Sequence, residues 1–195
     1  TGRIPLRYSP GLSLKNPYKL PEQLALFTDG DSLSAINRFN YDISEIGHLD
    51  YVTGALAYHL VKRPKVLIAE LSGGENILRA LYFNSEKIDV AETNPQIVEL
   101  LKKEYNNFSG NIYDLPTIKI YIGNLRNFLM ETKNLYDVIF IPSANSSAMS
   151  TAGFESVNPS NLFTVEAIKV YLDKLEANGI LSITSWIKIP PRNSL

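Results

Sequence analysis

A short glycine run followed at a fixed distance by an acid is the pattern in this chain best suited to holding a small molecule. Ser72, Gly73 and Gly74 follow an apolar run, and Glu92 ends the next apolar run, 18 residues after Gly74. Glycines after a strand let the backbone approach a ligand closely, and an acid ending the next strand can accept hydrogen bonds from both ribose hydroxyls. The pattern therefore predicts a nucleoside site.

The glycine loop departs from the full G-x-G-x-x-G spacing, because Glu70 and Ser72 stand where glycines are expected. A plain strand-to-helix connection also needs small residues, so this remains the alternative interpretation of the loop. Glu70 has two interpretations that the residues leave open. Its carboxylate either lies near an amino group of the ligand or blocks the pocket by bulk and charge.

The elements that must position these residues alternate regularly between strands and helices. Five Ile- and Val-rich strands separated by helices predict an α/β Rossmann-like fold, with a mostly parallel sheet buried on both faces. The strands are expected at 66–71, 87–91, 118–122, 138–141 and 179–186, and the helices at 75–82, 95–105, 125–131 and 164–176. Ligands of such sheets bind outside the carboxyl ends of the strands. The candidate loops are therefore 71–76, 92–94, 123–125 and 142–163.

Two units are predicted along the chain. Residues 1–46 are punctuated by Pro, Tyr and Gly and predict an extended arm with a small β-hairpin, pairing 24–27 with 33–36. Residues 47–195 form the nucleoside-binding domain, which a helix over 47–60 introduces. The chain begins at Thr and ends soon after a strand, so we expect it to be part of a longer protein.

Composition excludes several classes of function. The chain has 195 residues, with 19 Lys and Arg against 20 Asp and Glu, and no basic run marks a nucleic-acid surface. It contains no cysteine, so disulfides, thiolate metal sites and a cysteine nucleophile are excluded. No metal site is expected, since His48 and His59 lack ligand spacing and are interpreted as structural or surface residues. No apolar run is long enough to span a membrane, and a cytoplasmic location is expected.

Five segments of the chain together carry a family resemblance. They are the glycine loop, Glu92, Ile122-Gly123-Asn124-Leu125, Tyr136-Asp137-Val138-Ile139 and Leu162-Phe163-Thr164. In this order they resemble the spermidine synthase family of the class I methyltransferase superfamily, and most closely its large bacterial members, which are often fused to membrane segments. The resemblance covers about residues 8–192.

The resemblance implies a class I methyltransferase fold that binds S-adenosylmethionine, decarboxylated S-adenosylmethionine or methylthioadenosine. It places Glu92 on the ribose. It also implies that Asn124 and Leu125 border the adenine, with Asn124 standing where the family usually has Asp. The residues that would border the nucleoside and the amino-acid side are Ser72, Gly73, Gly74, Glu75 and Asn76.

The chemistry is where the chain departs from the family. Aminopropyl transfer needs a base for the attacking amine and carboxylates for a polycationic acceptor, which the family supplies from an Asp-Ser-Ser-Asp type loop. Here that loop reads Pro142-Ser143-Ala144-Asn145, and Leu33 replaces the Gln of the arm's Asp-Gly-x-x-Gln signature. A buried polyamine cation without a carboxylate costs several kcal/mol, so ordinary polyamine aminopropyl transfer is not expected.

Three functions follow as alternatives. The first is an adenosyl-ligand-binding transferase domain with an unknown acceptor and unassigned catalytic residues, and the second is a degenerate module that binds or assembles without catalysis. A dehydrogenase is the third and is disfavoured by the glycine spacing.

The Ser- and Asn-rich loop around Asn145 is interpreted as a surface loop or as a site for an uncharged acceptor. Tyr171 and Trp186 are expected in the core. A C-terminal hairpin is expected to be missing, and the open sheet edge would suit a homodimer.

Overall fold

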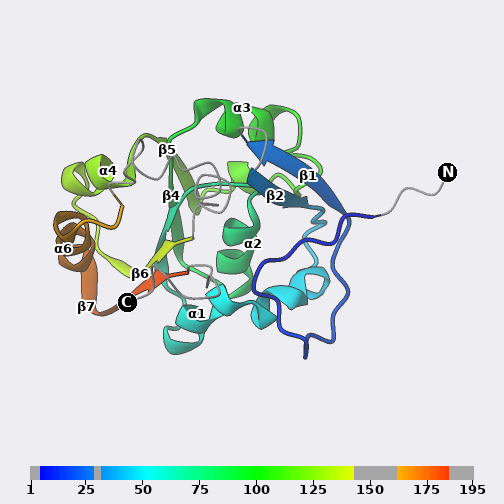
Figure 1. Cartoon of the computed structure of the whole chain (residues 1–195), viewed down its shortest axis with the longest axis horizontal. Helices are drawn as coiled ribbons and strands as arrows, with labels where there is room; N and C mark the ends of the chain where they lie inside the picture. The colour runs from blue at the N-terminus through cyan, green and yellow to red at the C-terminus, as the bar shows by residue number, and fades with distance from the viewer. Residues whose placement is uncertain (1–4, 29–31, 143–161, 185–195) are drawn as a thin grey trace, which may run out of the picture.

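The computed structural model describes residues 5–28, 32–142 and 162–184. Its main sheet has five parallel strands in the order β5-β4-β3-β6-β7, so the strand order reverses beside β3 (Figure 1). These strands are β3 (Lys65–Ala69), β4 (Lys87–Glu92), β5 (Ile118–Ile122), β6 (Tyr136–Ile141) and β7 (Leu175–Ile183). The predicted Rossmann-like α/β fold with a parallel sheet is confirmed.

Alternate residues of the central strands point to opposite faces of the sheet, and each face has its own apolar core. Val66 and Ile68 of β3 face α2 (Glu75–Tyr82) and α3 (Pro95–Lys103). Leu67 and Ala69 face α4 (Leu125–Glu131) and α6 (Val165–Asp173). Figure 1 shows α2 and the α4–α6 pair on opposite sides of the strands. Successive side chains of a strand alternate between the two faces, and helices cover both faces, so these strands are apolar throughout.

The arm forms the predicted hairpin, from β1 (Gln23–Thr28) and β2 (Ser32–Asn37), with Leu24 paired to Ile36 and Phe27 to Leu33. Leu26, Ile36 and Phe39 join the same apolar core as α2 and α3. The hairpin is therefore packed onto the main sheet unit. Asp29 and Gly30 of the arm signature lie outside the described residues.

The prediction of a single helix over 47–60 is wrong. Two 3₁₀ segments, η1 (Ile43–Tyr51) and η2 (Thr53–Ala55), precede a short α1 (Leu56–Leu60). Val52 between them is extended, with φ −96° and ψ 149°, and it forms an antiparallel bridge with Leu12. A contact with a residue 40 positions away therefore overrides the local helical pattern.

The last helix ends earlier, and the last strand begins earlier, than the sequence predicts. The helix predicted to reach residue 176 ends at Asp173, because Leu175 already pairs with Tyr136 as the first residue of β7. A register shift between Tyr136 and Val138 accommodates this early start. Tyr171 is fully buried, which confirms its place in the core, whereas Trp186 lies outside the described residues.

A buried acid ties the amino ends of two strands together. Asp89 of β4 is fully buried, and its Oδ2 accepts a hydrogen bond from the Tyr136 hydroxyl at 2.7 Å. Lys87 Nζ lies 2.8 Å from the same oxygen. A buried carboxylate needs such partners, since an unpaired buried charge is costly.

Replacing Asp89 with alanine is expected to lower the free energy of unfolding by about 3 kcal/mol, because it leaves the Tyr136 hydroxyl and the Lys87 ammonium without their acceptor. Urea denaturation monitored by circular dichroism measures the change. Glu99→Ala is the matched control, since it removes an exposed acid 2.6 Å from Lys103 and should cost less than about 1 kcal/mol. Equal effects of the two substitutions would contradict this account.

Candidate functional site

Glu92 joins three loops at the carboxyl ends of β3, β4 and β5. Its carboxylate accepts hydrogen bonds from the backbone N–H of Leu71 and of Asn94, both at 2.8 Å. Its carbonyl oxygen accepts a third from the N–H of Gly123 at 2.7 Å. The side chain is almost completely buried. The predicted ribose-binding acid therefore lies at the edge of the sheet expected for a ligand, where it also holds the surrounding loops.

The glycine loop lies beside Glu92, and contacts within the chain account for both of its glycines. A Cβ atom on Gly73 would lie 2.1 Å from the carbonyl oxygen of Ala35 in β2. Gly74 has φ +89°, and a Cβ there would lie 2.4 Å from the Tyr113 hydroxyl. Ser72 also has a left-handed backbone, with φ +48°, and is partly exposed. The loop is therefore tight because the hairpin and Tyr113 press on it.

The first turn of α2 directs its acid inward. Glu75 Oε1 lies 3.2 Å from Arg79 Nη2, and both side chains are largely buried. Asn76 is also buried. Burial raises the pKa of Glu75, while the charge of Arg79 opposes that rise. Glu75 and Asn76 thus follow the glycine loop as predicted, but Glu75 is engaged with the protein's own cation.

Arg79 is a buried residue that sequence reasoning missed. Its guanidinium lies 5.1 Å from the centroid of the Phe140 ring and packs against Gly54, where a Cβ would meet Nη1 at 2.3 Å. An acid four residues before an Arg on a helix with apolar neighbours was the available signal. Nothing in that pattern indicates that both side chains are buried.

His48 lies close to this pair and is fully buried, which agrees with its structural interpretation. Neither ring nitrogen has a hydrogen-bond partner within the described part of the chain. Burial, reinforced by the positive charge of Arg79, lowers the pKa of His48 from 6.5 to about 4. The imidazole is therefore neutral at neutral pH. His59, by contrast, is half exposed, with Nε2 2.9 Å from Asp50 Oδ1.

Asn124 and Leu125 stand at the carboxyl end of β5. Asn124 caps α4, since its Oδ1 accepts a hydrogen bond from the N–H of Arg126 at 2.8 Å. Leu125 is buried. The bond from Gly123 to the Glu92 carbonyl brings this loop beside Glu92. The structure therefore brings the 71–76, 92–94 and 123–125 loops to one edge.

Glu70 lies at the same edge, directly after β3. Its N–H donates to the Ala91 carbonyl at 2.8 Å, and its backbone is left-handed, with φ +82°. Burial and the charge of Glu92 raise the pKa of its carboxyl from 4.5 to about 7. A glycine would adopt this backbone without strain, so a glutamate at this position costs conformational free energy in the folded state.

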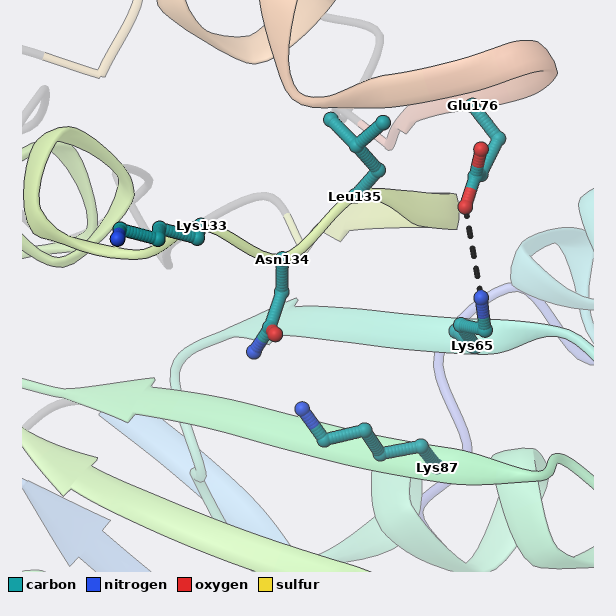
Figure 2. Close-up of a pocket in the computed structure, with 6 residues that line it drawn as sticks. All are labelled: Lys65, Lys87, Lys133, Asn134, Leu135 and Glu176. Atoms are coloured by element: carbon teal, nitrogen blue, oxygen red, sulfur yellow. Dashed lines mark hydrogen bonds and ion pairs between the residues drawn. The ribbon is translucent and has the colours of Figure 1, made fainter.

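A hollow of about 390 Å³ lies at the opposite, amino edge of the sheet and contains none of the predicted site residues. Figure 2 shows Lys65 Nζ reaching toward Glu176, 3.4 Å from Oε1. Lys87 and Lys133 also line the hollow, and Figure 2 shows the Lys133 side chain pointing away from Lys65 and Glu176. Because ligands of open parallel sheets bind at carboxyl ends, we do not assign the nucleoside site to this hollow.

Residues 44–188 match the spermine/spermidine synthase domain model. The chain belongs to the spermine/spermidine synthase family. It is 30% identical over 105 residues to the polyamine aminopropyltransferase of Prochlorococcus marinus, an alignment that covers 53% of this chain and 34% of that protein. It is also 30% identical over 90 residues to the polyamine aminopropyltransferase of Buchnera aphidicola, covering 45% of this chain and 31% of that one. Each alignment spans about a third of its curated relative.

Solved structures agree on the fold. A spermidine synthase in complex with the transition-state analogue AdoDATO matches with a TM-score of 0.57 at 24% identity, over 82% of this chain and 50% of that one. The spermidine synthase of Thermotoga maritima matches with a TM-score of 0.54 at 22% identity, over 82% and 47%. Human methyltransferase-like protein 13 in complex with SAH matches with a TM-score of 0.50 at 17% identity, over 69% and 62%. The class I methyltransferase architecture expected from the family is confirmed.

Proposed function

We propose that this domain binds an adenosyl ligand at the carboxyl edge of its sheet. The ligand would be S-adenosylmethionine, decarboxylated S-adenosylmethionine or methylthioadenosine. The observation that carries the proposal is the position of Glu92, which draws the loops after β3, β4 and β5 together. Family membership supports it, as do the similar structures solved in complex with AdoDATO or SAH.

Each site residue has a role in this proposal that its chemistry permits. Two hydrogen bonds leave lone pairs free on the Glu92 carboxylate, and these would accept the ribose hydroxyls. The amide of Asn124 would accept from the adenine amine through its remaining lone pair, beside Leu125. The loop bordering the rest of the ligand would consist of Ser72, Gly73, Gly74, Glu75 and Asn76.

The acceptor side of the proposed reaction differs from polyamine aminopropyl transfer. Pro142, which ends the described segment after β6, cannot serve as a base. Ser143, Ala144 and Asn145 lie outside the described residues, and their side chains carry no charge. If the domain is active, we propose a transferase that acts on an acceptor other than a simple polyamine.

The second candidate function is a degenerate module that binds or assembles without catalysis. Two observations favour it. Gly73 and Gly74 are explained by contacts with Ala35 and Tyr113, so they need no ligand to account for them. In addition, Glu70 places a second acid beside Glu92 at the proposed pocket.

Calorimetric titration of the purified chain with the three adenosyl compounds tests the proposal. We expect micromolar binding of at least one of them, and a loss of about 30-fold or more in affinity in Glu92→Gln, since hydrogen bonds to a charged acceptor are worth about 1.5–3 kcal/mol each. Glu99→Gln on the exposed face of α3 is the matched control and should bind as wild type.

One outcome would overturn the first candidate, and another would overturn only its acceptor prediction. No binding of any of the three compounds to the folded chain would favour the degenerate module. Turnover of putrescine with decarboxylated S-adenosylmethionine at ordinary rates would instead contradict the expected loss of polyamine chemistry. Because Glu92 also holds Leu71 and Asn94, the thermal midpoint of Glu92→Gln must be measured beside its affinity.

Several further expectations belong to the same proposal. The division at residues 46 and 47, the homodimer, the absence of nucleic-acid partners and the cytoplasmic location stay predictions. In the described segments, no helix is long and apolar enough to cross a membrane.

A further inference from the structure

Three leucines project from one side of the molecule, away from the proposed nucleoside site. Leu14, at the tip of a turn in the arm, is fully exposed, at 105%. Leu56 and Leu60, one turn apart on α1, are exposed at 69% and 70%. In Figure 1 the dark-blue part of the arm and α1 both reach the lower edge of the molecule. Single exposed leucines are common, whereas exposed apolar side chains gathered on one side of a protein often mark an interaction surface.

Backbone hydrogen bonds fix the turn that carries Leu14 next to α1. The N–H of Ser13 donates to the Tyr51 carbonyl at 2.8 Å, and the N–H of Thr53 donates to the Gly11 carbonyl at 3.0 Å. Ser13 and Leu56 line one hollow of about 490 Å³. Leu56 therefore lies at this hollow, and the backbone hydrogen bonds hold the turn that carries Leu14 at its rim through Ser13, with Leu60 one turn further along α1.

Basic side chains flank the leucines. Lys15 follows Leu14, and Lys62 and Arg63 follow Leu60; all three are exposed. The acid in the hollow is Asp50, whose Oδ1 lies 2.9 Å from His59 Nε2. A second acid, the exposed Glu86, lies beside Arg63, since its N–H donates to the Pro64 carbonyl at 3.0 Å. Three basic side chains thus stand against two acids next to the leucines, in a chain whose net charge is −1.

We propose that this side, formed by Leu14, Leu56, Leu60, Lys15, Lys62 and Arg63, rests on an anionic lipid surface. Exposed apolar side chains flanked by Lys and Arg are the pattern by which proteins lie in a membrane interface without crossing it. A protein partner would need a continuous complementary surface, whereas lipid can deform around separate projecting side chains.

Sedimentation with sucrose-loaded vesicles tests the proposal on the whole chain. We expect binding to vesicles of phosphatidylcholine with 30% phosphatidylglycerol at low salt, and much weaker binding to vesicles of phosphatidylcholine alone. The triple variant Leu14→Ser, Leu56→Ser, Leu60→Ser should lower the vesicle partition coefficient at least tenfold. The double variant Lys62→Ser, Arg63→Ser should lower it about tenfold or more on anionic vesicles.

The matched control is Met130→Ser with Leu172→Ser, which removes similarly exposed apolar side chains from α4 and α6 and should leave vesicle binding unchanged. Equal vesicle binding by wild type and the leucine variant would overturn the proposal, as would no binding by the folded wild type. Sedimentation equilibrium provides the other decisive outcome. Self-association that the leucine variant abolishes, without vesicle binding, would make this side a protein interface and the lipid proposal wrong.

Discussion

Replacing Gly73 with alanine is expected to lower the free energy of unfolding by about 3 kcal/mol, because the new methyl group would overlap the Ala35 carbonyl oxygen, 2.1 Å away. The obstructing atom belongs to the backbone of β2, so no side chain can rotate to relieve the overlap. The hairpin would have to move away from the loop, which would open the apolar core around Ile36. Urea denaturation followed by circular dichroism measures the loss.

Ser72→Ala in the same loop is the control for Gly73→Ala. Ser72 is partly exposed, and its replacement adds no atom, so we expect a change within about 0.5 kcal/mol. If Gly73→Ala were as stable as Ser72→Ala, the close approach of hairpin and loop would be refuted. The glycine would then need another explanation, and a ligand contact would be the first candidate.

Replacing Glu70 with glutamine is expected to stabilise the fold by about 3 kcal/mol above pH 7. In the folded chain the pKa of Glu70 is raised from 4.5 to about 7, so the folded state binds this proton more tightly than the unfolded state does. Wild-type stability should therefore fall as pH rises from 4.5 through 7, at about 1.4 kcal/mol for each unit of the shift. Glutamine carries no charge and avoids that loss.

The pH profile gives this prediction its sharpest test. The difference between Glu70→Gln and wild type should vanish below pH 4.5 and reach its full size above pH 7. His48 contributes in the opposite sense, since its lowered pKa makes stability fall as pH drops from 6.5 toward 4, but it does so equally in both proteins. Glu131→Gln, an exposed acid on α4, should show no such difference. A pH-independent gain in Glu70→Gln would contradict the account.

Glu70→Gly separates charge from backbone strain. Glycine removes the acid and also relieves the left-handed backbone, at φ +82°, so it should stabilise by about 1 kcal/mol more than glutamine above pH 7. That extra gain should persist at pH 4, where the charge no longer matters.

The alternation of strands and helices could be predicted from the sequence because each central strand is apolar on both faces and each helix is bounded locally. Asn94 caps α3 and is followed by Pro95, and Asn124 caps α4, so both helix starts are encoded within a few residues. The positions of Glu92 and the glycine loop follow from the same alternation, because each lies where a predicted strand ends.

What could not be predicted depends on contacts between distant residues. The break at Val52 requires Leu12, and the early start of β7 at Leu175 requires Tyr136. The pairing of Glu75 with Arg79 was visible as a spacing of four, but its burial depends on His48, Gly54 and Phe140 from other elements. The tight fit of Gly73 likewise depends on Ala35, which precedes it by 38 residues.

The three hydrogen bonds accepted by Glu92 have a further consequence for local unfolding. Leu71, Asn94 and Gly123 lie in different loops, yet the amide of each is bonded to this one residue. If Glu92 shifts, all three amides lose their acceptor together, so the loops that surround the proposed ligand open as one cooperative unit. The carboxyl edge of the sheet is thereby either closed as a whole or open as a whole. A ligand that fixes Glu92 would therefore reduce the local unfolding of all three loops through a single contact.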